Sequence, residues 1–172
     1  KNGEEIVEKA NKWRQKYHND RDILIFYIGR ITESKGVFEL IEAFKKIKRK
    51  DIFLYLSGKV DDSIRYKLYE LIKEDERIFL IDEETLPKPF EENEYLRMAY
   101  LYKAADIVVY PSKYEPFGLV PIEAIACEVP VLVRNIDNLE NFVKEGIALG
   151  FNGNLKEALE IAVNLSLIHI SE

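Results

Sequence analysis

Two kinds of hydrophobic pattern alternate along this chain. One is a short run that is apolar at every position, such as residues 23–28, and it is typical of a parallel strand covered by helices on both faces. The other repeats apolar residues every three or four positions, as in residues 37–47, and predicts an amphipathic helix. Strands are predicted at 23–28, 52–56, 78–81, 106–110, 130–133 and 147–149, and helices at 1–17, 37–47, 61–73, 91–104, 138–144 and 155–163, with a further helix from Gly118.

Strands that alternate with helices imply right-handed crossovers and therefore a parallel sheet. We expect an α/β fold with a doubly wound, mostly parallel, Rossmann-like sheet, in which ligands bind beyond the carboxyl ends of the strands. The expected organisation is an N-terminal helix and turn at 1–22, one Rossmann-like domain at 23–163, and a tail of uncertain origin at 164–172. The tail loses helical periodicity, which leaves either a non-native or displaced end or an added strand.

Composition narrows the class of protein. A chain of 172 residues with 47% apolar residues suits one domain with a real core. The net charge of -6 argues against a nucleic-acid partner, whose phosphates would need an excess of positive surface. The chain shows no apolar run near 18 residues and no secretion signal, and its one cysteine cannot form an internal disulfide, so a cytoplasmic protein is expected.

Two local features have ordinary explanations beside functional ones. The basic run at 45–50 could make a weak peripheral contact with anionic lipid, or its cations could complement the dipole at the end of a helix. Cys127 lies in an Ala-rich helix and is interpreted as a core thiol.

The only histidines, His18 and His169, offer no credible base for a Ser/His/Asp site, and no metal-ligand cluster appears.

Chemistry concentrates at the junction between the strand at 106–110 and the helix that follows. The loop between them is expected to present the backbone N–H groups of Phe117, Gly118 and Leu119 at a helix start, an arrangement that attracts phosphate. Glu115 and Glu123 flank this helix start, about 12 Å apart if both were helical. That separation suits a long ligand with a sugar ring at each end, although two solvated glutamates beside a buried helix would look the same.

Two motifs together resemble a known family. The loop after the first strand reads G-R-x4-K-G at 29–36, and P-S-x2-E-P-F-G-L-x3-E-A, which contains an E-x7-E motif, stands at 111–124. In this order they resemble the C-terminal, donor-binding half of retaining GT-B glycosyltransferases of the group 1 or GT4-like family, which includes glycogen-synthase-type enzymes. The resemblance covers residues 23–163 and makes this region a nucleotide-sugar-binding domain.

The resemblance implies a role for each matching residue. Arg30 and Lys35 would hold the donor diphosphate, Glu115 would bind hydroxyls of the transferred sugar, and Glu123 would bind the ribose diol. We therefore expect Glu115, Arg30 and Lys35 to take part in catalysis, without a cofactor or metal. The expected donor-binding residues are Gly29, Arg30, Lys35, Glu115, Pro116, Phe117, Gly118, Leu119 and Glu123.

The sequence also departs from the family pattern. Glu128 stands where the family has glycine, and Asp137-Asn138 replace a usual Gly-Gly, which leaves the loop near the donor sugar open. The Pro-containing loop at 82–90 lies where the family contacts the base, so the nucleotide cannot be carried over.

The family's reaction requires two domains, and this sequence contains one. We expect retaining hexosyl transfer from a nucleotide-diphosphate sugar, with the N-terminal acceptor-binding domain supplied elsewhere and the isolated chain inactive. The alternative is a noncatalytic nucleotide-sugar-binding or scaffolding module.

Overall fold

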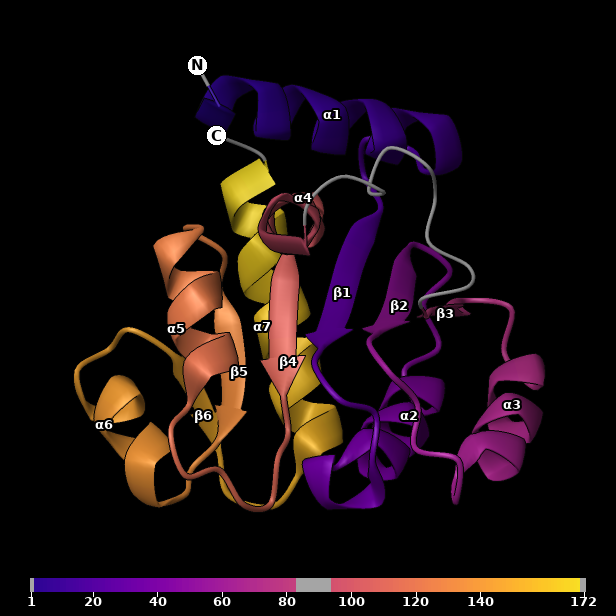
Figure 1. Ribbon diagram of the computed structural model, residues 1–172, viewed down its shortest axis with the longest axis vertical. Coiled ribbons are helices and arrows are strands. Elements are labelled where there is room, and N and C mark those ends of the chain that lie inside the picture. Colours follow the sequence, from indigo (N-terminus) through magenta and orange to yellow (C-terminus); the bar gives the residue numbers. More distant parts are fainter. Residues whose placement is uncertain (1, 83–93, 171–172) are drawn as a thin grey trace.

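The computed structural model describes residues 2–82 and 94–170, and its centre is a parallel sheet of six strands in the order β3-β2-β1-β4-β5-β6 (Figure 1). The strands are β1 (Ile23–Ile28), β2 (Ile52–Ser57), β3 (Ile78–Ile81), β4 (Ile107–Tyr110), β5 (Val131–Arg134) and β6 (Leu149–Phe151). The helices are α1 (Asn2–Tyr17), α2 (Val37–Lys45), α3 (Arg65–Lys73), α4 (Glu94–Ala104), α5 (Leu119–Ala126), α6 (Asp137–Lys144) and α7 (Leu155–Ile170), with a short 3-10 turn, η1, at Glu33–Lys35. The predicted doubly wound, Rossmann-like α/β fold is confirmed.

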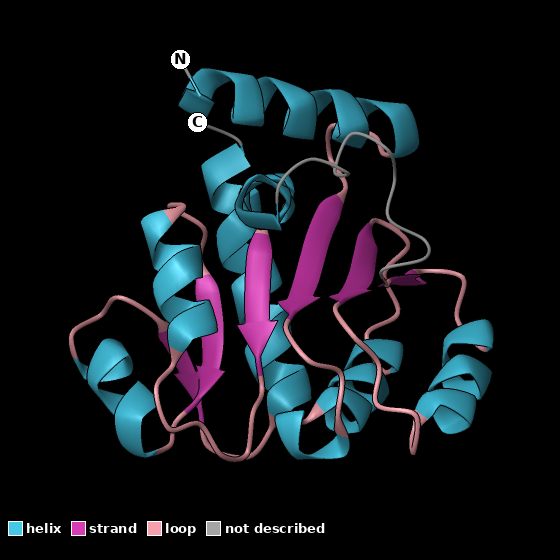
Figure 2. Ribbon diagram, viewed as in Figure 1, coloured by secondary structure: helices cyan, strands magenta, loops and turns pink. Residues whose placement is uncertain are grey.

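Helices cover both faces of the sheet (Figure 2). Strand β1 is buried along its whole length and sends alternate side chains into two separate cores. Ile23, Ile25 and Tyr27 pack with residues of α2, α3 and α7, whereas Leu24 and Phe26 pack with residues of α1, α4, α5 and α6. The continuous apolar run at 23–28 follows from this burial on both sides.

The strand order places a crevice at the carboxyl ends of β1 and β4. The chain leaves β1 toward β2 on one side and leaves β4 toward β5 on the other, so the two following loops diverge at this point. Gly36, with φ of 76°, permits close packing there, because a Cβ atom on it would lie 2.4 Å from the carbonyl oxygen of Pro111. The Lys113 N–H donates to the Ser34 carbonyl at 3.2 Å and joins the loops directly.

At two of the element boundaries that differ from the sequence prediction, local hydrogen bonds compete with the regular element. Helix α3 begins at Arg65 rather than at 61, since the Asp61 carboxylate accepts the Ser63 N–H at 2.9 Å and forms a turn. Strand β6 begins at Leu149 rather than at 147, because the N–H groups of Ile147 and Ala148 donate to the Phe142 carbonyl.

The C-terminal end is the largest difference from the prediction. Helix α7 runs to Ile170, past its predicted end at 163, so residues 164–170 are helical and the alternative of an added strand there is wrong. Ser166 is buried and Leu167 packs against the core, which keeps one face of the extended helix on the protein. The predicted loop at 83–90 and the predicted helix start at 91 lie outside the described residues.

The basic run at 45–50 is largely engaged with its own surroundings. Lys45 pairs with Glu74 at 2.6 Å and Arg49 with Asp51 at 2.6 Å, while Lys48 donates to the Lys45 carbonyl. These contacts favour the helix-end interpretation over lipid contact. No helix in the described part of the chain combines the length and apolar character that crossing a bilayer requires.

Candidate functional site

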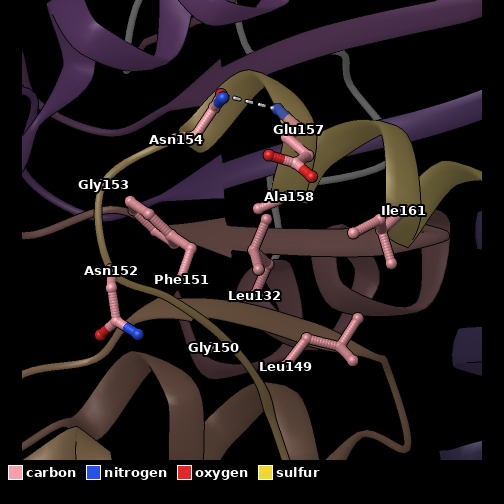
Figure 3. A pocket seen from close by; sticks show the side chains of 10 residues that line it. All are labelled: Leu132, Leu149, Gly150, Phe151, Asn152, Gly153, Asn154, Glu157, Ala158 and Ile161. Atoms are coloured by element: carbon pink, nitrogen blue, oxygen red, sulfur yellow. Dashed lines mark hydrogen bonds between the residues drawn. The ribbon is translucent and has the colours of Figure 1, made fainter.

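Two cavities near the sheet differ in the charges that line them. One, of about 310 Å³, lies between β6 and α7 (Figure 3), and Glu157 is the only charged residue among those that line it. The other, of about 200 Å³, lies where β1, β2 and β3 end, beside Gly29, and its lining includes Lys59, Asp82 and Arg97. An anionic ligand is therefore better matched to the second cavity, which adjoins the crevice between β1 and β4.

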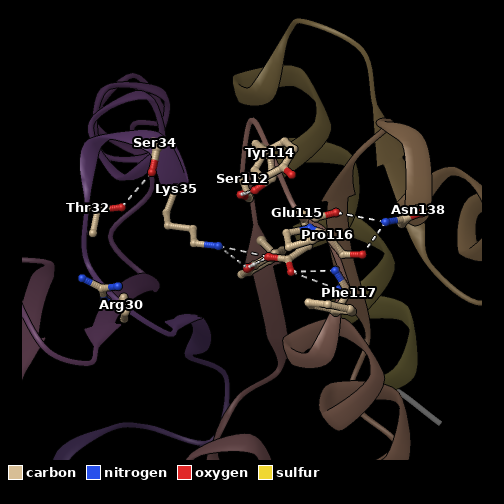
Figure 4. Close-up of polar contacts among 12 residues, drawn as sticks. Arg30, Thr32, Ser34, Lys35, Ser112, Tyr114, Glu115, Pro116, Phe117 and Asn138 are labelled. Carbon is tan, nitrogen blue, oxygen red and sulfur yellow. Dashed lines mark hydrogen bonds and ion pairs between the residues drawn. The ribbon is translucent and has the colours of Figure 1, made fainter.

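The crevice brings together the two loops that carry the sequence motifs (Figure 4). Arg30 follows β1 with an exposed side chain, and its backbone is held by the Tyr27 hydroxyl, which donates to the Arg30 carbonyl. Among the described residues, no hydrogen-bond partner is found for the Arg30 guanidinium. Lys35 ends η1 and points toward the loop after β4.

Lys35, Tyr110 and Glu115 form a compact polar cluster. The Lys35 Nζ atom lies 3.0 Å from Glu115 Oε2 and 3.1 Å from the Tyr110 hydroxyl, which itself donates to Glu115 Oε2. The side chain of Glu115 is 9% exposed and that of Lys35 is 25% exposed. The sequence predicted separate ligand contacts for Lys35 and Glu115, whereas here these two side chains contact each other.

The other carboxylate oxygen of Glu115 binds the backbone of the loop directly before α5. Oε1 accepts the N–H groups of Gly118 at 3.0 Å and Phe117 at 3.2 Å. The prediction that the loop leaves these two N–H groups free is therefore wrong, because Glu115 folds back onto them. The Leu119 N–H, at the first position of α5, has no acceptor among the described residues.

The surroundings of Glu115 keep it charged. Burial alone would raise its pKa, but hydrogen bonds from Tyr110, the Gly118 N–H, Lys35 and the Phe117 N–H outweigh it and lower the pKa to about 2. Burial opposes the charge of Lys35, yet Tyr110 and Glu115 raise the pKa of its ammonium group. At neutral pH the cluster is thus an ammonium–carboxylate pair joined by a neutral tyrosine.

Glu123 lies apart from this cluster, on the exposed side of α5. Its Oε2 accepts the hydroxyl of Tyr102 at 2.7 Å. Burial and this hydrogen bond raise the pKa of Tyr102, so its hydroxyl stays protonated as a donor. The structure therefore places the two glutamates of the E-x7-E motif in different polar environments.

Both departures from the family pattern have structural consequences. Asn138 stands at the start of α6 and donates from its side-chain amide to the carbonyls of Glu115, at 3.3 Å, and Pro116. Glu128 has φ of 59° and is the one non-glycine residue with positive φ in the described chain. The backbone there keeps a conformation that favours glycine, although the side chain has changed.

Sequence reasoning missed the tyrosines of this site and the role of Asn138. Tyr27 and Tyr110 stand in continuous apolar runs and were assigned only to strands, and Tyr102 only to a helix. Their buried positions at element ends were a usable signal, because a buried tyrosine normally needs a partner for its hydroxyl. Asn138 was noted only as a missing glycine.

Large apolar side chains are exposed around Glu115. Tyr114 is 71% exposed, Phe117 75%, Leu119 63% and Ile122 45%. Together they form an apolar rim on the loop that contains Glu115 and on the first turns of α5. Within residues 2–82 and 94–170, no cluster of three or more His, Cys, Asp or Glu side chains is arranged to hold a metal ion.

This chain belongs to the glycosyl transferases group 1 family, whose model matches residues 9–166. An uncharacterized glycosyltransferase of Methanocaldococcus jannaschii is 35% identical over 145 residues, which cover 81% of this chain and 34% of the relative. The chain thus spans about a third of that curated relative's length.

Solved structures show the same architecture, and neighbours of this fold are GT-B glycosyltransferases. The Anabaena protein HepE in complex with UDP-glucose gives a TM-score of 0.76 at 20% identity, covering 95% of this chain and 44% of that chain. A C-terminal domain of a glycosyl transferase group 1 family protein from Francisella tularensis gives 0.64 at 26% identity, covering 95% and 83%. The present fold thus covers less than half of HepE and most of the Francisella tularensis domain.

Proposed function

We propose that this chain is the donor-binding domain of a retaining hexosyltransferase that uses a nucleotide-diphosphate sugar. The observation that carries the proposal is the cluster of Lys35, Tyr110 and Glu115 at the crevice, with Arg30 exposed on the adjacent loop. Two cations beside an ionised carboxylate suit a ligand whose one part is a diphosphate and whose other part is a sugar. The complex of HepE with UDP-glucose supports this ligand class.

Each part of the donor then has a chemical partner. Arg30, the Leu119 N–H and Lys35 bind the diphosphate and stabilise the charge that develops on it as the leaving group. Glu115 accepts hydrogen bonds from sugar hydroxyls, and Glu123 accepts those of the ribose. The base occupies the cavity beside Gly29, where β1, β2 and β3 end.

The proposed enzyme needs a second domain for the acceptor. The chain covers 34% of the M. jannaschii relative and 44% of HepE, and an apolar rim surrounds Glu115. A covering domain would bury that rim and close the crevice, since large apolar side chains gain free energy when removed from water. We therefore expect the isolated chain to bind donor without transferring the sugar.

Titration calorimetry of the 172-residue chain with UDP, GDP and ADP tests donor binding. Arg30→Ala and Lys35→Ala should each weaken binding of the preferred nucleotide by about 1.5–3 kcal/mol, the worth of a charged hydrogen bond. Arg21→Ala is the matched control, because Arg21 is an exposed arginine at the opposite end of β1. A folded chain that binds no nucleotide at millimolar concentration would rule out the assignment.

Turnover tests the retaining mechanism once the acceptor domain is supplied. In that complete enzyme Glu115→Ala should lower kcat roughly 10- to 100-fold, more than it raises KM, because its hydrogen bond strengthens as the sugar gains positive charge. The product anomer is read by NMR. An inverted product, or robust transfer by the isolated chain, would contradict the mechanism.

A noncatalytic binding module is the second candidate. It is favoured by the pairing of Lys35 with Glu115, which satisfies both charged groups without a ligand. Such a module would bind UDP-glucose and UDP, yet addition of any acceptor domain would produce no transfer. The turnover measurement therefore separates the two functions.

A further inference from the structure

We propose that Tyr110 is a positioning residue that holds Glu115 in place for the donor sugar, so that the site binds a nucleotide sugar more tightly than the bare nucleotide. This inference rests on the proposed function. Tyr110 belongs to neither of the two sequence motifs, at 29–36 and 111–124, and is not among the expected donor-binding residues. Within residues 2–82 and 94–170, the hydroxyl of Tyr110 is the one group that hydrogen-bonds with both Lys35 and Glu115.

Tyr110 is better anchored than either of its partners. It is the last residue of β4, pairs with Val133 of β5 in the sheet, and is 4% exposed. Lys35 and Glu115, in contrast, come from a short 3-10 turn and a loop. A hydroxyl fixed on a central strand therefore sets the position of a carboxylate that its own backbone holds less firmly.

An incoming diphosphate changes the contacts of Glu115. The Lys35 ammonium group has three N–H donors, of which Tyr110 and Glu115 use two. A diphosphate competes for this cation, and Glu115 then depends on its neutral donors, the Tyr110 hydroxyl and the N–H groups of Phe117 and Gly118. Burial and Glu115 raise the pKa of Tyr110, so the phenol keeps its proton and continues to donate.

Lys35 and Glu115 then bind different parts of the donor, the first the phosphates and the second the sugar. Lys35 can turn to the phosphates because Tyr110 retains Glu115 at the sugar end. Loss of the Tyr110 hydroxyl would leave Glu115 Oε2 with Lys35 as its sole remaining partner among those described. With Oε2 no longer held by a donor fixed on the strand, the sugar would lose an oriented acceptor, whereas the Lys35 ammonium group would keep its N–H donors for the diphosphate.

The test compares Tyr110→Phe with Tyr55→Phe in the 172-residue chain. Tyr55 is a matched control because it is 5% exposed and its hydroxyl has one hydrogen-bond partner among the described residues, His18, at 2.6 Å. Calorimetry with UDP and with UDP-glucose should show that Tyr110→Phe weakens UDP-glucose binding about tenfold or more, the scale of a hydrogen bond to a charged group, and changes UDP binding far less. Tyr55→Phe should affect both ligands equally and slightly.

A second measurement reports on Glu115 itself. Carbon-13 NMR titration of the glutamate carboxyl groups, with Glu115→Gln to identify the signal, should show that Tyr110→Phe raises the pKa of Glu115 and that Tyr55→Phe does not. Equal losses for UDP and UDP-glucose in a folded Tyr110→Phe variant, or an unchanged Glu115 titration, would overturn the role of Tyr110. Failure of the unmodified chain to bind either ligand would instead overturn the proposed function.

Discussion

Polar clusters lie at both ends of the sheet, and they shift the pKa values of their carboxylates in opposite directions. At the amino end, Asp106 accepts Arg14 Nη1 at 2.9 Å and the Leu24 N–H at 2.7 Å. At the carboxyl end, Glu115 accepts Lys35, Tyr110 and two backbone N–H groups. Burial raises the pKa of Asp106 despite Arg14, whereas the donors around Glu115 lower its pKa to about 2.

The difference follows from the number of donors and from what each cluster joins. Arg14 also donates to the Ala104 carbonyl at 2.7 Å and the Asp22 carbonyl at 3.2 Å, so the amino-end cluster attaches α1 to the rest of the fold. The carboxyl-end cluster joins two loops whose remaining surface faces the crevice. A partly buried ion pair at one end thus serves the fold, and a donor-rich carboxylate at the other remains charged for a ligand.

The largest expected effect comes from breaking the amino-end cluster. Arg14→Ala should reduce the free energy of unfolding by about 3 kcal/mol, because it leaves a partly buried carboxylate without its cation. Chemical denaturation measures the loss. Lys12→Ala is the control, since Lys12 lies on the same helix in an exposed pair with Glu8. Equal losses in the two variants would show that the amino-end pair does not stabilise α1.

The contributions of Glu115 and Asp106 to the free energy of unfolding should change with pH in opposite directions. Because the pKa of Glu115 is lowered from 4.5 to about 2, its contribution is complete above pH 4.5 and disappears as the pH falls toward 2. Asp106 has a raised pKa, so its contribution is present below its ordinary value of 3.8 and is lost as the pH rises.

Unfolding curves across this range, for the unmodified chain, Glu115→Gln and Asp106→Asn, measure these contributions. The stability difference between the unmodified chain and Glu115→Gln should shrink by about 1–3 kcal/mol as the pH falls. The corresponding difference for Asp106→Asn should grow in the same direction. Parallel curves of stability against pH for Glu115→Gln and Asp106→Asn would refute the opposite pKa shifts of the two carboxylates.

The smallest effect concerns Asn138, which replaces a glycine of the family pattern. Asn138→Gly should weaken UDP-glucose binding about 2- to 10-fold, because the loop loses hydrogen bonds from the amide to the carbonyls of Glu115 and Pro116. Calorimetry on Asn138→Gly and on Asn138→Ala separates two effects. Both variants lose the side-chain amide, whereas only Asn138→Gly also adds backbone freedom. If Asn138→Ala binds as the unmodified chain does, the amide has no role in holding the loop.

The sequence by itself determined the fold class and the place of the candidate site. Continuous apolar runs such as 23–28 occur because helices bury β1 on both faces, and this pattern is visible without coordinates. Because parallel strands end at one edge, the loops that contain Arg30 and Glu115 had to face the same crevice. The motifs then indicated the glycosyltransferase family, which the family match confirms.

Only the tertiary structure decided how the polar groups pair. Tyr110 reads as an ordinary apolar strand residue until the fold brings Lys35, 75 positions earlier in the chain, to within 3.1 Å of its hydroxyl. Glu115 was placed correctly on its loop, but its return to the N–H groups of Phe117 and Gly118 depends on loop geometry. Hydrogen bonds require positions correct to a few tenths of an ångström, whereas hydrophobic burial requires only the correct face, so periodicity predicts the second and not the first.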